Sequence, residues 1–592
     1  MLLKQFSRIG DDAASEVDAL LTWKGSLDKQ SQHILASWQP NHPPCSSGGN
    51  WSGISCNEAR RVETIDLDSY GLRGTLHDFT FSSFKHLIEI SLGNNSLYGT
   101  IPSNISMLSK LGYLDLRYNN FSGSIPLGIC FLTNLKILSL YENNISGTIP
   151  KEIGSSLVKL TYLDLSRNAL TGVVPDSIGN LTELTVLTLS FNQLFGFIPS
   201  SIGNLINLEK LQLYGNQLNG SIPQSVGRLT SLVLLGLSTN NFSGPVPSSI
   251  GNLLKLETLY LLPMSLKNCT SLERVRLEMN QLSGDLDLGI YPHLDYIDLS
   301  HNNFSGTLSS NWGKCKSLTS LKISNNKIGG RLPKNFGEAS QIQMLDLGSN
   351  NLFGEIPISF ANMTSLFNLN LEDNMLSGVI PNEIRMLSGL SSLNLASNNL
   401  SGIIPQDIGQ CRNLMTLNLS FNSFGANIPS QIGNIRSLQN LDLSHNQLSG
   451  EVPQEFGQLV VLESLRLSNN NISGLLPSTL ENCISLTSID ISNNEFEGPL
   501  PNIRAFQNAT SDSVKNNKDV IDQRVSPPVT NDEIDKVILI TKLAFACVQQ
   551  NPQSRPTMHD VSNQLAAKLK PKNAAAAVEF SSIKIGELLA IG

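Results

Sequence analysis

The chain has 592 residues, 15% of them charged, and a formal net charge of −8. So modest an acidic charge argues against nucleic-acid binding, which needs a basic surface. No stretch of 18 apolar residues is present, so the sequence predicts no membrane-spanning helix, and residues 1–21 lack the apolar run of a signal peptide.

The first 60 residues do not share the pattern of the rest of the chain. We expect residues 1–14 to be disordered and residues 15–60 to form a separate unit ahead of the repeats. This unit contains the stretch DALLTWKGSLDKQSQHILASW, which begins at Asp18. It leads through Cys45 to the motif WSGISC, which ends at Cys56.

Residues 61–505 repeat one short pattern. The segments LGYLDLRYNNFSGSIP (111–126) and LQNLDLSHNQLSGEVP (438–453) both fit L-x-x-L-x-L-x-x-N-x-x-x-G-x-[IV]-P. The motif Asn returns mostly at steps of 24 residues, and about 19 strands are expected. It stands at Asn95, Asn119, Asn143, Asn168, Asn192, Asn216, Asn240, Asn280, Asn302, Asn326, Asn350, Asn374, Asn398, Asn422, Asn446, Asn470 and Asn494.

The chemistry of the repeat explains its pattern. Alternation along L-x-x-L-x-L buries the last two Leu side chains and exposes the residues between them. Asn can hydrogen-bond the backbone of the turn where strand pairing ends, Gly permits the bend, and Ile-Pro fixes a short extended segment. Because one repeat cannot bury its own Leu side chains, the repeats are predicted to stack into a solenoid.

This version of the repeat, with L-x-G-x-I-P-x-x-I-G-N-L, resembles the plant-specific leucine-rich repeats of receptor-like kinases and receptor-like proteins, over residues 15–510. The resemblance implies an α/β solenoid: a right-handed superhelix with a parallel concave sheet, an N-terminal helical cap and a short C-terminal helical tail. It also implies that Cys45 and Cys56 form a disulfide in the cap, which requires an oxidising compartment.

One part of the array, residues 262–292, breaks the period. Asn240 and Asn280 are 40 residues apart, where two repeats of 24 residues need 48. The strand before Pro263 runs on without an Asn turn or a Gly. We expect the concave sheet to continue across this fault and the outer wall to be irregular around residues 263–269.

Four further cysteines, Cys269, Cys315, Cys411 and Cys483, occupy one equivalent position, three residues before the Leu that opens a strand. Cys411 and Cys483 are three repeats apart, roughly 14 Å at about 4.8 Å per strand, which exceeds the roughly 7 Å reach of a disulfide. These cysteines are predicted to be buried core thiols rather than bridges or metal ligands.

Sequons of the form N-x-[ST] are dense along the chain. The repeat itself creates six of them, so their density is weak evidence for glycosylation, but with the cap cysteines it favours an exported glycoprotein. The sequons are at Asn50, Asn94, Asn104, Asn120, Asn144, Asn180, Asn219, Asn241, Asn268, Asn303, Asn362, Asn399, Asn418, Asn471 and Asn508.

Residues that flank the buried strand Leu face the concave side of such a solenoid, where aromatic and Arg side chains act as interface anchors. The early repeats are rich in them, whereas the later repeats offer mostly Ser, Asn and Asp. The predicted ligand-binding residues are Tyr113, Arg117, Tyr118, Tyr141, Tyr162, Arg167, Phe191, Tyr214, Tyr260, Arg274 and Arg276.

Arg274 and Arg276 form the motif RVR with Val275. They are expected to project together, roughly 7 Å apart, in an arrangement that suits a carboxylate. They look like the R-x-R motif that some peptide-hormone receptors use to bind the free C-terminus of a peptide. The alternative is that they are solvated charges near Glu273 and Glu278.

The sequence shows no motif of an enzyme active site. It has no glycine-rich phosphate loop, no H-E-x-x-H and no C-x-x-C pair, and its eight His residues are scattered. The strand Asp residues, such as Asp115 and Asp164, occupy one repeat position and are interpreted as solvated, stacked side chains. We therefore predict no catalytic site, no metal site and no cofactor.

The C-terminal residues depart from the repeat, with a predicted linker at 506–529, two helices at 530–570 and a disordered or weakly structured tail at 571–592. The segment NPQSRPTMHDV (551–561) resembles the last helices of the kinase C-lobe in plant receptor-like kinases, with Arg555 at the position that pairs with the Glu of the A-P-E motif. The glycine loop and the V-A-I-K, H-R-D, D-F-G and A-P-E motifs are missing, so the chain resembles a truncated or mis-spliced kinase without activity.

These features predict the extracellular binding module of a plant receptor-like kinase of the peptide-sensing type with about twenty repeats. The resemblance implies a peptide or protein ligand, a shorter leucine-rich-repeat co-receptor kinase as partner, and a parent family at the plasma membrane. One alternative is a receptor serine/threonine kinase of which this chain is an incomplete product. The other is a soluble repeat inhibitor of pathogen cell-wall enzymes.

Overall fold

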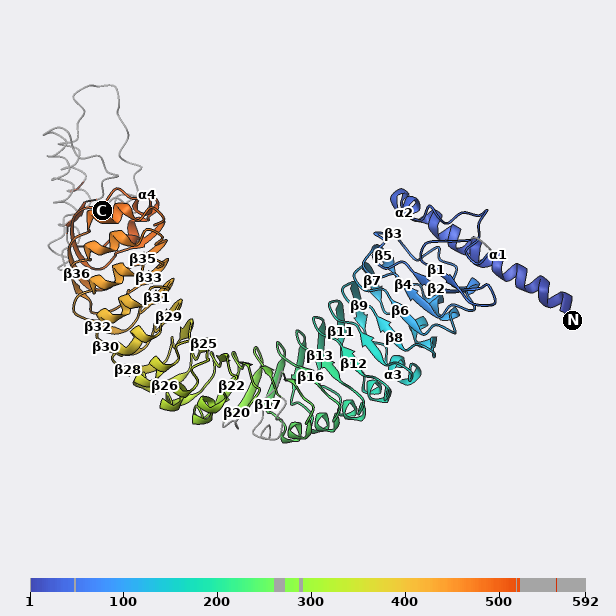
Figure 1. The fold of residues 1–592 in the computed structure, drawn as a ribbon, viewed down its shortest axis with the longest axis horizontal. Helices are drawn as coiled ribbons and strands as arrows, with labels where there is room; N and C mark the ends of the chain where they lie inside the picture. Colours follow the sequence, from blue (N-terminus) through green and yellow to red (C-terminus); the bar gives the residue numbers. More distant parts are fainter. Residues whose placement is uncertain are drawn as a thin grey trace, which may run out of the picture. The chain divides into compact units, whose positions relative to one another are not determined.

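The computed structural model describes residues 2–46, 49–259, 272–286, 291–517, 519–521 and 561. The chain divides into two compact units, Met1–Asn422 and Ser423–Gly592. In both units the described residues consist mostly of short parallel strands and single helical turns that follow one another in chain order (Figure 1). The core of each unit is therefore built repeat by repeat.

The first unit opens with a helical cap. Helix α1 (Leu2–Ser26) includes residues that the sequence analysis expected to be disordered, and their backbone is helical in the structure. Helix α2 (Lys29–Ile34) is capped by the carboxylate of Asp28, which accepts a hydrogen bond from the backbone N–H of Ser31. Strand β1 (Ile54–Cys56) pairs antiparallel with β2 (Val62–Asp66), the first strand of the array.

Aromatic rings and one buried ion pair hold the cap together. Trp38 and Trp51 are almost fully buried and stack with ring centroids 5.4 Å apart. The buried carboxylate of Glu16 accepts hydrogen bonds from the Arg61 guanidinium at 2.7 Å and from the backbone N–H of Val62 at 3.1 Å. Cys45 and Cys56 form the disulfide that was predicted from the family resemblance.

An inner ladder of parallel strands runs through each unit, one strand per repeat. In β6, the buried Leu114 separates Tyr113 and Asp115, and Leu114 lies in register with Leu138 of the next repeat. In the first unit the ladder contains β2, β4 (Glu89–Ser91), β6 (Tyr113–Asp115), β8 (Ile137–Ser139), β10 (Tyr162–Asp164), β12 (Val186–Thr188), β14 (Lys210–Gln212), β16 (Leu234–Gly236), β18 (Thr258–Leu259), β19 (Arg274–Arg276), β21 (Tyr296–Asp298), β23 (Ser320–Lys322), β25 (Met344–Asp346), β27 (Asn368–Asn370), β29 (Ser392–Asn394) and β31 (Thr416–Asn418). In the second unit it contains β33 (Asn440–Asp442), β35 (Ser464–Arg466) and β37 (Ser488–Asp490). The described residues thus contain the 19 strands that the repeat count predicted.

A second ladder of parallel strands, the outer ladder, follows the Asn turns. In the first unit it contains β3 (Arg73–Gly74), β5 (Ser96–Thr100), β7 (Asn120–Ser124), β9 (Asn144–Thr148), β11 (Ala169–Gly172), β13 (Gln193–Gly196), β15 (Gln217–Gly220), β17 (Asn241–Pro245), β20 (Gln281–Asp285), β22 (Asn303–Ser305), β24 (Gly329–Arg331), β26 (Asn351–Gly354), β28 (Met375–Gly378) and β30 (Asn399–Ile403). In the second unit it contains β32 (Ser423–Gly425), β34 (Ser449–Gly450), β36 (Asn471–Leu475), β38 (Glu495–Pro499) and β39 (Asp519–Ile521).

A helical turn after the Pro of most repeats completes the circuit around the core. These turns in the first unit are η1 (Phe81–Ser83), η2 (Ser103–Met107), η3 (Leu127–Phe131), α3 (Glu152–Ser156), η4 (Asp176–Asn180), η5 (Ser200–Asn204), η6 (Gln224–Arg228), η7 (Ser248–Asn252), η9 (Ser310–Lys314), η10 (Lys334–Glu338), η11 (Ile358–Asn362), η12 (Asn382–Met386) and η13 (Gln406–Gln410). The second unit has η14 (Ser430–Asn434), η15 (Gln454–Gln458) and η16 (Ser478–Asn482), followed by α4 (Arg504–Asn508) and η17 (Ser511–Ser513).

The motif Asn residues form a ladder of side-chain hydrogen bonds within each unit. At Asn192, Oδ1 accepts from the backbone N–H of Leu170 in the preceding repeat at 2.9 Å. Its Nδ2 donates to the carbonyls of Leu165, at 3.0 Å, and Leu189, at 3.1 Å. The predicted turn role of Asn is confirmed, and each Asn also bonds the repeat before it. The preceding residue, Phe191, has a left-handed backbone with φ 52°.

The two ladders cross the short repeat differently. Strand β18 pairs with both β16 and β19, so the inner sheet continues as predicted. Strand β17 pairs directly with β20, and the backbone N–H of Phe242 donates to Oδ1 of Asn280, 38 residues away. The outer ladder and the Asn ladder therefore omit the short repeat, which lacks the Asn turn.

Several predicted features lie outside the described residues. They are Tyr260, Asn268, Cys269, the irregular wall at 263–269, the kinase-like helices at 530–570 apart from Val561, and the tail at 571–592.

The other cysteines of the repeat series confirm their predicted role. Cys315, Cys411 and Cys483 are buried and form no disulfide. Burial raises the pKa of the Cys411 and Cys483 thiols from 9.0 to about 11. They are core residues of the array.

Replacement of Asn192 by Ala should destabilise the array. The change leaves the buried N–H of Leu170 without its acceptor, at a cost of about 1–3 kcal/mol for an unsatisfied buried group. The carbonyls of Leu165 and Leu189 each keep one hydrogen bond from a neighbouring motif Asn. Equilibrium urea unfolding followed by circular dichroism measures the loss. The matched control is Gln193→Ala at the exposed neighbouring position, and equal stability of the two variants would contradict the role given to the Asn ladder.

The core thiols should resist alkylation. At about pH 8, a thiol whose pKa is raised by about two units has a thiolate fraction roughly a hundredfold lower, and the thiolate is the nucleophile. Iodoacetamide labelling read by mass spectrometry should therefore leave Cys411 and Cys483 unmodified in the folded chain and modify them fully in urea. Rapid labelling of the folded chain would show that the repeats open locally at these positions.

Candidate ligand-binding surface

The exposed face of the inner sheet in the first unit carries the predicted ligand-binding residues. Tyr113 and Tyr162 lie within strands and are half-buried, whereas Arg274 and Arg276 are exposed on β19. The others lie just beyond strand ends: Arg117, Tyr118, Tyr141, Arg167, Phe191 and Tyr214. Their contacts gather them into three groups.

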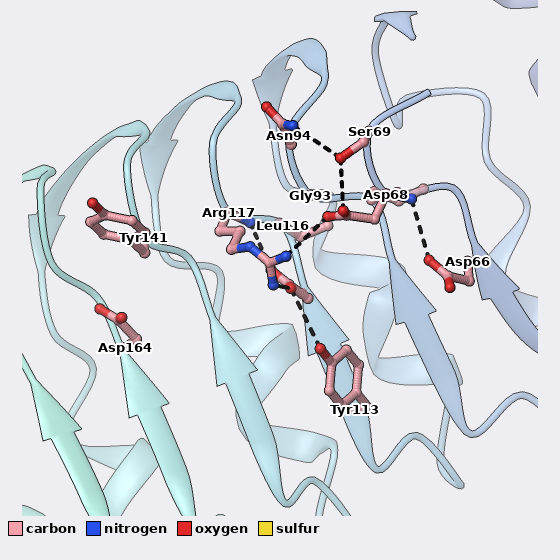
Figure 2. Close-up of polar contacts among 12 residues, drawn as sticks. Asp66, Asp68, Ser69, Gly93, Asn94, Tyr113, Leu116, Arg117, Tyr141 and Asp164 are labelled. Carbon is pink, nitrogen blue, oxygen red and sulfur yellow. Dashed lines mark hydrogen bonds and ion pairs between the residues drawn. The ribbon is translucent and has the colours of Figure 1, made fainter. Parts of the chain in front are cut away.

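Arg117 is held between two carboxylates in the first group. Its guanidinium donates to Asp115 of its own repeat and, at 3.2 Å, to Asp68, two repeats earlier (Figure 2). The hydroxyl of Tyr113 also donates to Asp115, at 3.5 Å. Burial raises the pKa of Asp115, against the lowering effect of the Arg117 backbone N–H and guanidinium. The Arg117 side chain is still 38% exposed, so it is both ordered and accessible.

Tyr118 and Tyr141 form an aromatic pair in the same group. Their rings meet edge to face with centroids 4.9 Å apart, and the Tyr118 hydroxyl donates to the Tyr141 hydroxyl at 3.2 Å. The hydrogen bond from Tyr118, followed by burial, raises the pKa of Tyr141. Such pairs add stability beyond the area they bury, so each ring fixes the position of the other.

Tyrosine hydroxyls bond the strand Asp residues at a fixed spacing. Tyr162 donates to Asp164 at 3.3 Å, as Tyr113 does to Asp115, and burial together with the Asp164 charge raises the pKa of Tyr162 to about 12. The interpretation of these Asp side chains as solvated is wrong for Asp115 and Asp164, which are 1% and 9% exposed. The reason is local: tyrosine hydroxyls and turn N–H groups replace water around each carboxylate.

The second group links four consecutive repeats. Arg167 lies 3.5 Å from the carboxylate of Glu142, and its guanidinium carbon is 4.7 Å from the ring centroid of Phe191. Phe191 in turn meets Tyr214 edge to face, with centroids 5.1 Å apart. The stacked guanidinium keeps half of its surface exposed, and it can still donate hydrogen bonds while its face covers the ring.

The third group surrounds Tyr296. The guanidinium carbon of Arg276 lies 5.1 Å from the Tyr296 ring centroid, and Nζ of Lys322 lies 5.6 Å from the same centroid. The Tyr296 hydroxyl donates to Asp298 at 3.1 Å, and Lys322 is 3.7 Å from that carboxylate. Arg276 and Lys322 thus flank one aromatic residue, each from a strand that pairs with its own.

The surroundings of Arg274 and Glu278 complete the third group. The nearest carboxylate to Arg274 is that of Asp295, at 3.9 Å, and its side chain remains 59% exposed. Burial and the charge of Asp298 raise the pKa of Glu278, and Arg276 and Lys322 act in the opposite direction. The group therefore combines exposed cations with a partly buried carboxyl.

Comparison with known proteins agrees with this architecture. A leucine rich repeat model matches residues 133–194, 292–352, 316–376, 412–472 and 436–496, and a second one matches residues 110–132, 207–229, 231–253 and 389–411. A leucine rich repeat N-terminal domain model matches residues 13–57. The cap and the array thus correspond to known modules.

Similarity to solved structures identifies the family more closely. The chain is similar to the plant peptide hormone receptor RGFR1 in complex with RGF2, with 33% identity and a TM-score of 0.65, over 76% of this chain and 80% of that one. It is also similar to the Arabidopsis receptor kinase HAESA in complex with the peptide hormone IDA and the co-receptor SERK1, with 31% identity and a TM-score of 0.59, over 82% and 91%. The chain belongs to the plant leucine-rich-repeat receptor kinase family.

The curated relatives are much longer than the segments matched to this leucine-rich-repeat chain. A probable leucine-rich repeat receptor-like protein kinase of Arabidopsis thaliana is 41% identical over 90 residues, which are 15% of this chain and 8% of that protein. Receptor-like protein kinase 7 of the same plant is 34% identical over 113 residues, 11% of its length.

Sequence reasoning missed part of the surface of this leucine-rich-repeat chain. Asp68, Glu142, Tyr296 and Lys322 all contact predicted residues, yet none was predicted. Tyr296 could have been found, because it stands two residues before Asp298, as Tyr113 and Tyr162 stand before theirs. The other three carry no such signal, because their contacts come from neighbouring repeats.

Within the described ranges, no cluster of three or more His, Cys, Asp or Glu side chains could hold a metal ion. Over the same residues, no helix has both the length and the apolar character needed to cross a membrane.

Proposed function

We propose that this chain is an extracellular binding module that recognises a peptide together with a shorter leucine-rich-repeat co-receptor kinase. Structures of relatives in complex with peptide hormones, one of them with a co-receptor, support the proposal. The observation that carries it is the series of three ordered groups of aromatic and cationic side chains along one face of the inner sheet.

These groups favour binding because their side chains are already held in place. Aromatic and Arg side chains dominate the energetics of protein interfaces, and a side chain already fixed by its neighbours loses less entropy when a ligand binds. Arg117 is fixed by carboxylates, Arg167 by Glu142 and Phe191, and Arg276 by Tyr296. A peptide that crosses the strands can contact successive groups without reordering them.

The third group suits a carboxylate at one end of that peptide. Arg274 and Arg276 stand on the same side of β19, with the buried Val275 between them. Lys322, two strands further on, adds a third cation. We propose that Arg274 and Arg276 bind the free C-terminus of the peptide, because guanidinium groups pair with carboxylates through charge-assisted hydrogen bonds.

Arg274→Ala and Arg276→Ala should each weaken the binding of peptides with a free C-terminus. A hydrogen bond to a charged group contributes about 1.5–3 kcal/mol, so each change should raise Kd roughly 10- to 150-fold. A synthetic peptide library, with every sequence made as free acid and as C-terminal amide, is screened by surface plasmon resonance. The hits should prefer the acid on the unmodified chain and lose that preference in the variants.

Arg385→Ala is the matched control, because this Arg is exposed on η12 away from the three groups. It should leave the acid preference intact. Equal loss of binding in Arg385→Ala, or an acid preference that survives Arg274→Ala and Arg276→Ala, would contradict the carboxylate role. If binding depended on Arg117 and Arg167 alone, the ligand would be assigned to the first two groups.

We also propose that the chain has no kinase activity of its own and is displayed outside the plasma membrane of a plant cell. The missing phosphate loop, V-A-I-K lysine and H-R-D motif support the first part. Incubation of the purified chain with radiolabelled ATP and Mg²⁺ should give no phosphate incorporation. Phosphorylation that stops when Mg²⁺ is chelated would contradict this proposal.

A further inference from the structure

Exposed aromatic rings on the outer ladder are an unexplained feature of the first unit. Most outward side chains of these strands are polar, but Tyr98 is 46% exposed, Phe195 48% and Phe353 44%, and Phe197, directly after β13, is 67% exposed. Such rings face water in the bare chain. Single exposed rings are common in soluble proteins, whereas adjacent ones usually have something that covers them.

The register of the outer ladder places two of these rings directly beside sequons. Tyr98 of β5 pairs with Asn120 of β7. Phe195 and Gly196 of the preceding repeat lie beside Gln217 and Leu218 of β15. One further step in the same register sets Phe197 beside Asn219, at the strand spacing of about 4.8 Å.

Local packing brings the Phe197 ring still closer to its sequon. The sequon Asn219-Gly220-Ser221 has a glycine at its centre. A Cβ at Gly220 would lie 2.3 Å from Cδ1 and 2.4 Å from Cε1 of Phe197, so only a glycine lets the ring lie across the strand at this point. The ring therefore lies over the backbone next to Asn219.

Asn120 lies at a surface hollow that is also lined by aromatic residues. Tyr98 and Asn120 line a shallow hollow of about 640 Å³ together with Tyr118 and a second sequon residue, Asn94. An N-acetylglucosamine attached to Asn120 would start at the rim of this hollow, with the Tyr98 ring alongside it.

The other sequons of the outer ladder have polar neighbours at the equivalent position. Asn144 lies beside Ser122, Asn241 beside Asn219, Asn303 beside Ser283, Asn399 beside Ser377, and Asn471, in the second unit, beside Ser449. An aromatic neighbour is thus specific to Asn120 and Asn219 in this set, and the rest provide internal controls.

We infer that Asn120 and Asn219 carry N-linked glycans whose first sugars pack on Tyr98 and Phe197. The face of a pyranose ring that carries C–H bonds fits the electron-rich face of an aromatic ring, and contact removes apolar area of both from water. A glycan at Asn219 also covers Phe195 in the same outward row. This inference needs passage through a secretory pathway but no peptide ligand, so it does not depend on the proposed recognition of a peptide.

The full chain, fused to a secretion leader and produced in insect cells, provides the test. Glycopeptide mass spectrometry should find Asn120 and Asn219 occupied. An endoglycosidase that cuts between the first two N-acetylglucosamines should then trim these two sites of the folded protein several-fold more slowly than Asn144. After denaturation all sites should be trimmed at one rate, which would show that the difference comes from the fold.

Exchange of the residue beside each sequon Asn should change the rate at which the glycan on that Asn is trimmed. Phe197→Ser gives Asn219 the neighbour that Asn144 has, and its glycan should be trimmed as fast as that of Asn144. Tyr98→Ser should do the same for Asn120, whereas Ser377→Tyr, which changes no sequon, should slow trimming at Asn399 beside it. All three positions are outward-facing, so the variants should retain the unfolding midpoint of the parent.

Unoccupied Asn120 and Asn219, or trimming rates that ignore these exchanges, would overturn the inference. Self-association of the chain that Phe197→Ser abolishes while Asn219 is unglycosylated would also overturn it, and would assign the rings to an interface between two copies. A failure of peptide binding would leave the glycan result unchanged, so the two proposals are separated.

Discussion

The hydrogen-bond ladder of the motif Asn residues is the constraint on which the rest of the array depends. Each side chain satisfies backbone groups of two repeats at the point where regular strand pairing ends. These groups are buried, and a buried unpaired donor or acceptor is costly. The ladder therefore fixes both the turn within a repeat and the stacking of one repeat on the next.

That constraint also places the candidate ligand-binding residues. The residue before the motif Asn has a left-handed backbone in most repeats, and Tyr118, Arg167 and Phe191 all occupy that position. Non-glycine residues adopt this conformation only when their surroundings impose it. Because the Asn bonds impose it in repeat after repeat, side chains from adjacent repeats meet at the strand spacing and form the ring and cation pairs.

The short repeat shows that the two ladders are separable. The inner ladder needs only backbone pairing of a few residues, so β18 can join β16 and β19 without an Asn turn. The outer ladder begins at that turn, and without it β17 passes directly to β20. Arg274 and Arg276 stand on β19, the first strand after this fault, where the inner sheet has one strand more than the outer ladder.

The covered carboxylates show how polar groups are tolerated on the sheet. Burial of the charged carboxylates of Asp115, Asp164 and Asp298 without partners would cost free energy. Each carboxylate accepts one hydrogen bond from the hydroxyl of a Tyr two residues earlier and one from the backbone N–H two residues later. The same bonds immobilise the Tyr rings, so the stability of the sheet and the order of the surface have one cause.

The sequence by itself determined the repeat period, the number of inner strands, the cap with its disulfide, the buried thiols and the position of the fault. The period, the strands, the thiols and the fault follow from local rules that recur along the repeats: alternation of Leu, the Asn turn and the Gly bend. The cap disulfide was implied by the family resemblance. Only the tertiary structure decided which charged groups meet. The contacts of Arg117 with Asp68, of Arg167 with Phe191 and of Lys322 with Tyr296 join residues that are 24 to 49 positions apart. Their pairing depends on side-chain reach between neighbouring strands, which the repeat pattern does not encode.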